Sequence, residues 1–462
     1  MVGAGVAGLT CAALLAQAGL RVGVLEARSC AGGRARSWRD ERTGVAVDVG
    51  PHVVSTEHRQ FLQLLERFGP RDAIAWQPQP MIELLDAQGR LQVPDCCWMP
   101  PLHGLPMLPA ALRRLGWRDV FSHLRLAWQG ARANERSLRD LDAIDALSWL
   151  RARGVSERSI DWFWRSALLA LLNVPLEQCS AAAAMRVFRL MLGRSGYHFG
   201  FPRVALASLF VPGLEQTIRA AGGEVRTQAA VRSLVVERGT FQGIRLRDGT
   251  VLSAPVGVLA TAPWDAVPLL ARTGLAALDP LQHAARGFVG APYTSTLLWL
   301  DRRVTDRCFW ARVWNPQDLN TDFYDLAAIR PELAGGGSVI ACNAIGPNAH
   351  LEWDDERVIA RTRAELAQFA PAANDARLLH ARVHRIRGAI PQPRPGTETL
   401  RPGNRTPVQG LLVAGDWTDT AVPCSMESAA RSGALAVQCV LGPGVAVPPP
   451  ETHGLVGLLR RP

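Results

Sequence analysis

Three glycines at the start of the chain constrain its fold more than any other feature of the sequence. Gly3, Gly5 and Gly8 form the pattern G-x-G-x-x-G, with Ala7 inside it. In such a turn the first glycine permits a tight bend, the second lets the backbone approach a pyrophosphate, and the third lets a helix pack closely on a strand. The phosphates then bind at the N-terminus of the helix. The pattern predicts a Rossmann-like unit that binds a dinucleotide.

The residues after the glycines supply the rest of such a unit. An Ala/Leu-rich run over Cys11–Ala18 predicts a helix that ends at Gly19, and Leu20–Leu25 predicts a strand. Glu26 closes this strand about 20 residues after the turn, where a carboxylate can bind an adenosine ribose. Ala27 follows it at the same strand end.

The strand before the turn is short in this sequence. Only Met1 and Val2 precede Gly3, whereas an interior parallel strand usually has about four to eight residues. We therefore expect the sequence to begin inside that strand. A chain with the strand restored should be more stable and bind its cofactor more tightly.

Charge and composition exclude several classes of protein. The net charge is +10, and all 51 basic residues are arginine because the sequence contains no lysine. A basic excess can attract phosphate-rich partners, but no zinc finger, RNA-binding signature or basic tract is present, so we expect no nucleic-acid partner. No metal-ligand spacing is present either.

The apolar runs and the cysteines bear on the location of the protein. The longest apolar stretches, such as Ala167–Leu172 and Leu411–Ala414, are far shorter than the ~20 residues that span a bilayer. The odd count of nine cysteines, without a charged and then apolar leader, favours a reducing compartment. We expect a cytoplasmic protein, with peripheral contact to the inner membrane as a further expectation.

Further motifs lie near the two ends of the chain. Gly32–Ser37 reads G-G-R-A-R-S, and Asp48–His52 reads D-V-G-P-H. Near the C-terminus, Leu411–Thr418 reads L-L-V-A-G-D-W-T, and Ser425–Ala429 reads S-M-E-S-A. Together these motifs resemble the superfamily of FAD-containing amine oxidases and carotenoid desaturases. The resemblance spans nearly the whole chain and implies that the cofactor is FAD, bound noncovalently because no Ser-Gly-Gly-Cys attachment motif is present.

The resemblance also assigns roles to individual residues. The glycine doublet and Arg34 would lie at the pyrophosphate, Arg36 would approach the flavin or a phosphate unless it is a solvated surface residue, and Asp416 would bind ribityl hydroxyls. The helix that begins near Ser425 would direct N–H groups at the pyrimidine edge of the flavin. The predicted cofactor-binding residues are Gly3, Gly5, Ala7, Gly8, Glu26, Ala27, Gly32, Gly33, Arg34, Arg36, Gly50, Pro51, His52, Val231, Gly415, Asp416, Met426 and Ala429.

The chain is long enough for two domains, because single cores stop growing at about 250 to 300 residues. We expect an α/β fold: a discontinuous Rossmann-like FAD-binding domain with an inserted α+β substrate domain. The FAD-binding domain would comprise residues 1–71, 204–265 and 381–441, the substrate domain residues 72–203 and 266–380, and a flexible tail residues 442–462. Strands are predicted over residues 224–227, 230–237, 241–246, 256–261, 295–300 and 338–344, and a helix over residues 354–369.

The substrate class is narrowed by the same resemblance. Flavin amine oxidases commonly use a lysine near the flavin and a tyrosine cage, whereas this chain has no lysine and three tyrosines. The stretch Trp164–Ala181 resembles hydroxysqualene dehydroxylases, and Phe201–Val204 resembles both these enzymes and phytoene desaturases. This favours hydride transfer with an apolar polyisoprenoid, in a dehydroxylase or a desaturase reaction. An amine oxidase and a noncatalytic flavin-binding protein stay open.

Two further expectations concern the chemistry and the surface. His52 is the candidate acid or base, since an imidazole can donate and accept near neutral pH; a structural hydrogen bond within its turn is the alternative. The stretch Leu112–Trp128 places arginines beside Leu, Trp and Phe, which would suit the surface of a membrane or the solvated face of an ordinary helix. The sequence does not indicate an oligomeric state.

Overall fold

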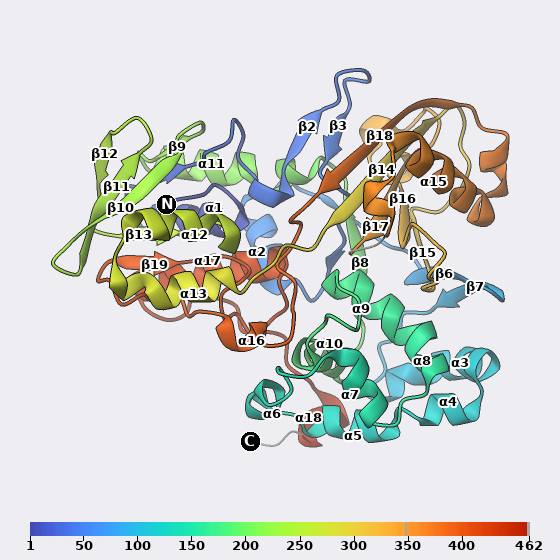
Figure 1. The fold of residues 1–462 in the computed structure, drawn as a ribbon. Helices are drawn as coiled ribbons and strands as arrows, with labels where there is room; N and C mark the ends of the chain where they lie inside the picture. Colours follow the sequence, from blue (N-terminus) through green and yellow to red (C-terminus); the bar gives the residue numbers. More distant parts are fainter. Residues whose placement is uncertain (347–348, 460–462) are drawn as a thin grey trace.

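The computed structural model describes residues 1–346 and 349–459, which form three neighbouring regions (Figure 1). A nucleotide-binding unit lies at one side, a seven-stranded sheet with a long helix lies at the other, and a group of helices lies beneath the sheet in this view. Each of the first two regions is assembled from segments that are far apart in the sequence.

A short parallel sheet forms the centre of the nucleotide-binding unit. Its strands pair as two parallel couples, β1 with β9 and β13 with β19. These strands are β1 (Gly23–Leu25), β9 (Glu224–Arg226), β13 (Gly257–Leu259) and β19 (Leu411–Val413).

Val2 joins the two couples into one sheet. Its N–H donates to the carbonyl of Val258 at 2.9 Å, and its own carbonyl accepts from the Ala260 N–H at 2.8 Å. On the other side, the Gly3 N–H donates to the Leu25 carbonyl at 2.8 Å. Val2 therefore occupies the central strand position that the glycine motif requires. It pairs with Leu25 and with Leu259 through one isolated bridge each.

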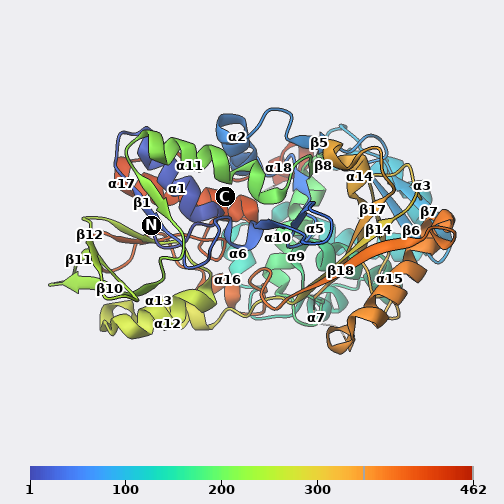
Figure 2. The ribbon, with the colours of Figure 1, turned by 90° about the horizontal axis from the view of Figure 1, so that it is seen from above.

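Helices cover one face of this sheet and a small antiparallel sheet covers the other. Alternate strand residues point to opposite faces, so Val24 joins the core under the helices and Leu25 joins the core under the antiparallel sheet. Figure 2 shows three helices lying alongside one another on the first face. They are α1 (Val6–Gln17), α11 (Val211–Ala220) and α17 (Met426–Leu441). The second face carries β10 (Val231–Glu237), β11 (Thr240–Leu246), β12 (Val251–Ser253), α12 (Pro263–Thr273) and α13 (Asp279–Arg286).

The second region is a seven-stranded sheet of order β18-β14-β17-β16-β15-β6-β7. One face packs on α15 (Asp355–Phe369), and the other packs on β3 (Ala46–Asp48) and β8 (Phe199–Pro202). The strands are β18 (Leu378–Ile386), β14 (Tyr293–Leu300), β17 (Val339–Ile345), β16 (Asp322–Asp325), β15 (Phe309–Arg312), β6 (Ile82–Asp86) and β7 (Gly89–Val93).

The third region is helical and has its own core around Trp164. Its helices are α3 (Leu108–Leu115), α4 (Trp117–Phe121), α5 (Leu124–Arg132), α6 (Glu135–Arg139), α7 (Ala146–Ala152), α8 (Glu157–Ser159), α9 (Arg165–Leu172) and α10 (Ala181–Gly193). The remaining elements are α2 (Arg59–Phe68), α14 (Leu326–Ile329), α16 (Thr397–Leu400), β2 (Ser37–Arg39), β4 (Val54–Ser55) and β5 (Ile74–Trp76).

The chain end beyond residue 441 lies against the helical region. Helix α18 (Gly454–Leu459) packs on α5 and α10, and its Val456 is buried. The His453 N–H donates to the Gly193 carbonyl at 2.8 Å. The tail was expected to be flexible, but its described residues fold back onto the protein. The reason is that the apolar helix α18 packs on the helical region.

The predicted secondary structure agrees with the structure over most elements. Each of the six strands predicted between residues 224 and 344, and the helix over 354–369, is present with ends shifted by at most two residues. The strand predicted over Leu20–Leu25 begins only at Gly23, because the Leu20 N–H still bonds back to the Leu15 carbonyl at 3.1 Å.

Two of the expected domain divisions fall inside elements. The division at 265/266 cuts α12, which packs on β10 in the nucleotide-binding unit. The division at 380/381 cuts β18, which pairs with β14 along its length. Divisions after residues 286 and 386 would leave both elements whole, and we propose those instead.

Candidate functional site

Two of the three motif glycines are required by the packing of the protein itself. Gly3 has φ +106°, and a Cβ there would lie 2.6 Å from the Ala260 carbonyl oxygen. A Cβ on Gly8 would lie 2.0 Å from the Gly3 carbonyl oxygen, so α1 could not approach the turn as closely as it does. These two positions match the tight bend and the close helix packing expected from the sequence.

Gly5 is different, because nothing in the protein demands a glycine there. Its φ of −82° is ordinary for any residue, and the nearest atom to an added Cβ is the Gly33 Cα at 3.8 Å. No side chain caps the first turn of α1. Uncapped N-terminal amides beside a bare backbone suit a bound phosphate. The conformation and packing of the protein would therefore admit a side chain at Gly5, and no contact within the protein accounts for a glycine there.

The glycine doublet lies against this turn. The Gly32 N–H donates to the Ala4 carbonyl at 2.8 Å, and a Cβ on Gly33 would lie 2.9 Å from the Gly5 Cα. Both doublet glycines have positive φ, at +108° and +62°. The structure therefore brings the second motif into contact with the first.

Glu26 lies at the end of β1, next to the same turn. Its carboxylate accepts from the Ala4 N–H at 3.0 Å and from the Arg28 N–H at 2.9 Å. Ala27 beside it is exposed. The Glu26 carbonyl accepts from the Ala229 N–H at 2.8 Å, which places the segment leading to Val231 next to it. Glu26 and Val231, both predicted to bind the cofactor, are therefore brought near each other through this segment.

Arg34 and Asp416 form an ion pair that joins the two ends of the sequence. The guanidinium donates to both carboxylate oxygens of Asp416, at 2.6 and 3.0 Å, and also to the Ala389 carbonyl at 3.2 Å. Burial acts to lower the pKa of Arg34, but the attraction of Asp416 outweighs it and the net shift is upward. The sequence suggested separate contacts with phosphate and ribityl groups, whereas here the two side chains bind each other.

The chain around Asp416 is held by a network that the sequence reasoning did not assign. The Gly415 N–H donates to the Ser432 hydroxyl at 2.9 Å. The buried Arg401 donates to the carbonyls of Asp416 and Thr418 at 3.0 and 2.9 Å. Only the fold shows that Arg401 fastens the loop behind Asp416.

Helix α17 begins at Met426, as expected, with the Ser425 hydroxyl accepting from the Ser428 N–H at 3.1 Å. Met426 and Ala429 are half-buried and pack on the core beneath α1. The adjacent Glu427 does not cap its own helix. Its carboxylate accepts from the Gln60 and Phe61 N–H groups at 3.0 and 2.8 Å, and so caps the start of α2.

The turn at Gly50–His52 lies between this unit and the seven-stranded sheet. A Cβ on Gly50 would lie 2.6 Å from the ring of Tyr293, a buried residue on β14. Nδ1 of His52 lies 2.8 Å from the Gly50 carbonyl, so Nδ1 carries the proton and donates it. Burial lowers the pKa of His52, which makes the ring neutral near pH 7. Pro51, between them, is half-buried.

Arg36 stays close to the doublet. Its guanidinium lies 3.5 Å from the Gly33 carbonyl and 6.0 Å from the centre of the Trp38 ring. Burial lowers the pKa of Arg36, and the nearby Arg28 adds to this effect. Arg36 is therefore half-buried at the cofactor turn and is not a freely solvated surface arginine.

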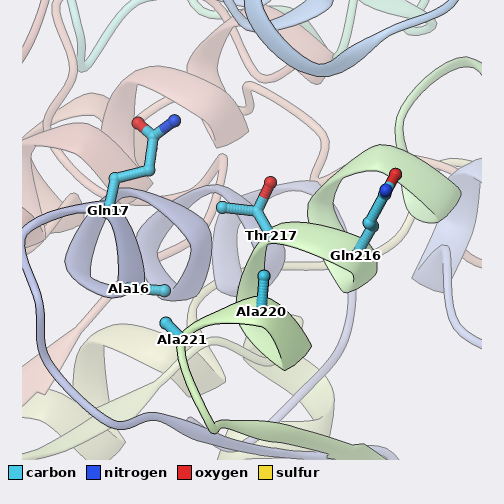
Figure 3. Close-up of a pocket in the computed structure, with 6 residues that line it drawn as sticks. All are labelled: Ala16, Gln17, Gln216, Thr217, Ala220 and Ala221. Carbon is cyan, nitrogen blue, oxygen red and sulfur yellow. The ribbon is translucent and has the colours of Figure 1, made fainter.

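A surface pocket lies elsewhere, between the ends of α1 and α11 (Figure 3). Its volume is about 420 Å³, and Gln17, Gln216 and Thr217 are among the residues that line it. It opens at the C-terminal end of α1, away from Gly5 at the N-terminal end. This pocket therefore takes no part in the site formed by the glycine motifs.

A comparison with known protein families shows to which family the chain belongs. The model of the flavin-containing amine oxidoreductases matches residues 6–441 of the chain. The chain belongs to this family. It is an FAD-dependent oxidoreductase.

The curated relatives of this flavoprotein include carotenoid desaturases. It is 24% identical over 457 residues to a 15-cis-phytoene desaturase of Synechococcus elongatus, covering 95% of this chain and 94% of the relative. It is also 24% identical over 481 residues to a zeta-carotene desaturase of Synechocystis, covering 96% of both chains.

Solved structures of amine oxidases share the fold of this flavoprotein. Wild-type putrescine oxidase bound to putrescine has a TM-score of 0.68 at 18% identity, covering 96% of this chain and 98% of that one. Cyclohexylamine oxidase from Brevibacterium oxydans has a TM-score of 0.68 at 18% identity, covering 95% and 97%. The predicted Rossmann-like fold with a second, inserted unit is confirmed. In the part of the chain that the structure describes, every helix is too short or too polar to cross a membrane.

Proposed function

We propose that this flavoprotein transfers a hydride between FAD and a carbon of an apolar polyisoprenoid, in a reaction of the hydroxysqualene dehydroxylase type. The observation that carries the substrate class is the likeness to phytoene and zeta-carotene desaturases over 95% and 96% of the chain. A long hydrocarbon binds mainly by burying CH₂ groups at about 0.8 kcal/mol each.

The residues described above would hold the cofactor in a fixed place. The amides at the start of α1 and the bare backbone of Gly5 and Gly33 would take the pyrophosphate, and Glu26 would take the ribose. Arg34 and Asp416 would fix the two segments on either side of the cofactor. Bound FAD would supply the redox chemistry, since its ring accepts or gives up a hydride.

In the proposed site, His52 is a proton acceptor. Its Nδ1–H is engaged with the Gly50 carbonyl, which leaves the lone pair of Nε2. A neutral imidazole of lowered pKa accepts a proton more readily than it donates one near pH 7. A proton acceptor at this position would serve the desaturase alternative, in which a proton must leave the substrate.

The helical region carries an exposed apolar face that we propose as a surface for membrane contact. Trp117 is 63% exposed and Leu124 is 62% exposed, and arginines lie among them. The Arg118 guanidinium lies 5.3 Å from the ring centre of Trp117. The exposed apolar side chains that we assign to this face are Trp98, Met99, Leu102, Leu105, Trp117, Phe121, Leu124 and Trp128. Leu455 and Leu458 are also exposed, on α18, which packs on α5.

Replacing two tryptophans of this face should weaken membrane binding. The double variant Trp117→Ser and Trp128→Ser should bind vesicles containing phosphatidylglycerol about tenfold more weakly, because both rings would otherwise enter the interface. Leu379→Ser, an equally apolar exposed residue on β18, serves as the control. Co-sedimentation measures the binding, and equal binding of all three proteins would argue against the surface.

Product analysis tests the proposed reaction. The purified flavoprotein should convert hydroxysqualene to squalene when a two-electron donor reduces the flavin. Conversion of phytoene with an electron acceptor would establish the desaturase alternative. Turnover of amines, with no turnover of either isoprenoid, would contradict both and support an amine oxidase.

A further inference from the structure

A row of polar side chains crosses the seven-stranded sheet from strand to strand. Ser295 on β14 is paired in register with His384 on β18 and with Asn343 on β17, and Asn343 is paired with Asp322 on β16. Directly paired residues of neighbouring strands point to the same face of a sheet. His384, Ser295, Asn343 and Asp322 therefore form one continuous line, called here the polar row.

Each member of the polar row has a buried polar atom without a partner. These atoms are Nε2 of His384, the hydroxyl of Ser295, Oδ1 of Asn343 and Oδ1 of Asp322. Ser295 is fully buried, and Asn343 and Asp322 are 2% and 7% exposed. An unpaired buried polar atom costs about 1–3 kcal/mol. Four such atoms in register across one face of the sheet indicate a place where a polar ligand group completes the hydrogen bonds.

The polar row adjoins the cofactor site at two points. Tyr293 lies two residues before Ser295 on β14, on the same face, and its ring packs against Gly50. At the other end, the ring of His384 lies 4.8 Å from that of Trp38, which follows Arg36 by two residues. The face that carries the row is thus the face turned toward the predicted flavin-binding turns.

We propose that the polar row binds a hydroxyl group of the substrate, and that Asp322 gives a proton to that hydroxyl oxygen. The proposal rests on the dehydroxylase function proposed above and deepens it, because a pure hydrocarbon has no group that would use the row. The unpaired Oδ1 of Asn343 would accept the hydroxyl hydrogen, and the Ser295 hydroxyl would complete the contact.

The proton moves from the Asp322 carboxyl to the hydroxyl oxygen, and the C–O bond breaks with both electrons on oxygen, which leaves as water. Bound reduced FAD would supply the hydride that the carbon needs, and a two-electron donor of the reduced nicotinamide class would restore the reduced cofactor. Asp322 regains its proton from water.

The surroundings of Asp322 suit a proton donor. Burial raises the pKa of Asp322 to about 7, although interactions with Asn343 and Tyr324 oppose the rise. The other titratable groups around it are the phenols of Tyr293 and Tyr324 and the thiol of Cys342. Burial raises the pKa of each well above its ordinary value, so all three are neutral near pH 7. At the far end of the row, burial lowers the pKa of His384, and Arg382 and Arg36 add to this while Asp40 opposes it.

Binding and turnover of the FAD-loaded protein in detergent micelles test the proposal. Perturbation of the flavin spectrum by hydroxysqualene and by squalene gives the two dissociation constants. The wild type should prefer the alcohol at least about tenfold, the worth of one good hydrogen bond. Ser295→Ala and Asp322→Asn should lose this preference without a change in squalene binding. The Cys342→Ala variant should keep this preference. Cys342 directly precedes Asn343 on β17, and its side chain lies on the opposite face of the sheet.

The pH profile separates a proton donor from a structural group. Wild-type turnover of hydroxysqualene should fall about tenfold per pH unit above about 7, as the carboxyl ionises. Ser295→Ala should keep this profile at a lower rate, and Asp322→Asn should be at least about 100-fold slower, without the decline.

The outcomes separate this proposal from the proposed function. If the wild type, Ser295→Ala and Asp322→Asn all turn over hydroxysqualene equally well, the proposed role of the polar row is overturned and the dehydroxylase function still stands. Preferential binding of the alcohol that is lost in both variants, without turnover by the wild type, would support the row as a hydroxyl site and contradict the dehydroxylase reaction. Equal affinity of the wild type for hydroxysqualene and squalene would overturn the proposal that the polar row binds a hydroxyl group.

Discussion

The Gly5→Ala variant is expected to fold like the wild type and to purify without FAD. The φ of Gly5 is one that alanine adopts freely, and the added Cβ meets no protein atom closer than 3.8 Å. In the proposed site, the same Cβ would stand where the pyrophosphate approaches the backbone. We expect FAD affinity to fall at least about 100-fold, which corresponds to about 2.7 kcal/mol.

Two reference variants make this prediction specific. Gly8→Ala places a Cβ 2.0 Å from the Gly3 carbonyl oxygen and should destabilise the apoprotein by about 3 kcal/mol or more. Gly23→Ala, on β1 with no atom within 4 Å of the added Cβ, should change neither property. Thermal melts of the apoproteins and flavin titrations measure both effects. Full FAD binding by Gly5→Ala would contradict the assignment of this turn.

Arg34→Met is expected to lower the free energy of unfolding by about 2 kcal/mol, because it leaves the carboxylate of Asp416 buried and unpaired. The value lies below the 3–5 kcal/mol typical of fully buried pairs, since the Arg34 side chain is 29% exposed and partly screened. Asp416→Asn in the same chain should recover part of the loss, since no buried charge then remains.

Urea unfolding of the two single variants and the double variant measures the coupling between Arg34 and Asp416. Arg21→Met, at an exposed arginine of the same unit, is the control and should unfold like the wild type. Additive effects of the two changes would mean that the pair does not join the N-terminal and C-terminal segments.

The Rossmann-like unit could be predicted from the sequence because short stretches of the chain determine each of its elements. The spacing of Gly3, Gly5 and Gly8 specifies a turn, and the run before Gly19 specifies a helix, without reference to the rest of the chain. The short runs over residues 230–237 and 241–246, in which apolar and polar side chains alternate, are typical of β-strands. The structure places each of these elements within a few residues of its predicted position.

The contacts between distant segments could not be predicted in the same way. That Arg34 would bind Asp416, 382 positions away, depends on how two loops meet after folding. The same holds for Glu427, which caps α2 and not its own helix. The polar row shows this most clearly, because its members come from four strands and are brought into line only by the register of the sheet.

The most direct test of the central claim, an FAD enzyme acting on a polyisoprenoid, is a single anaerobic titration. The purified flavoprotein is reduced, the excess reductant is removed, and hydroxysqualene is added while the visible absorbance of oxidised flavin is followed. We predict that the absorbance returns with one squalene formed per flavin. Flavin that stays reduced with hydroxysqualene, in a protein whose oxidised form is bleached by an amine and not by phytoene, would contradict the account.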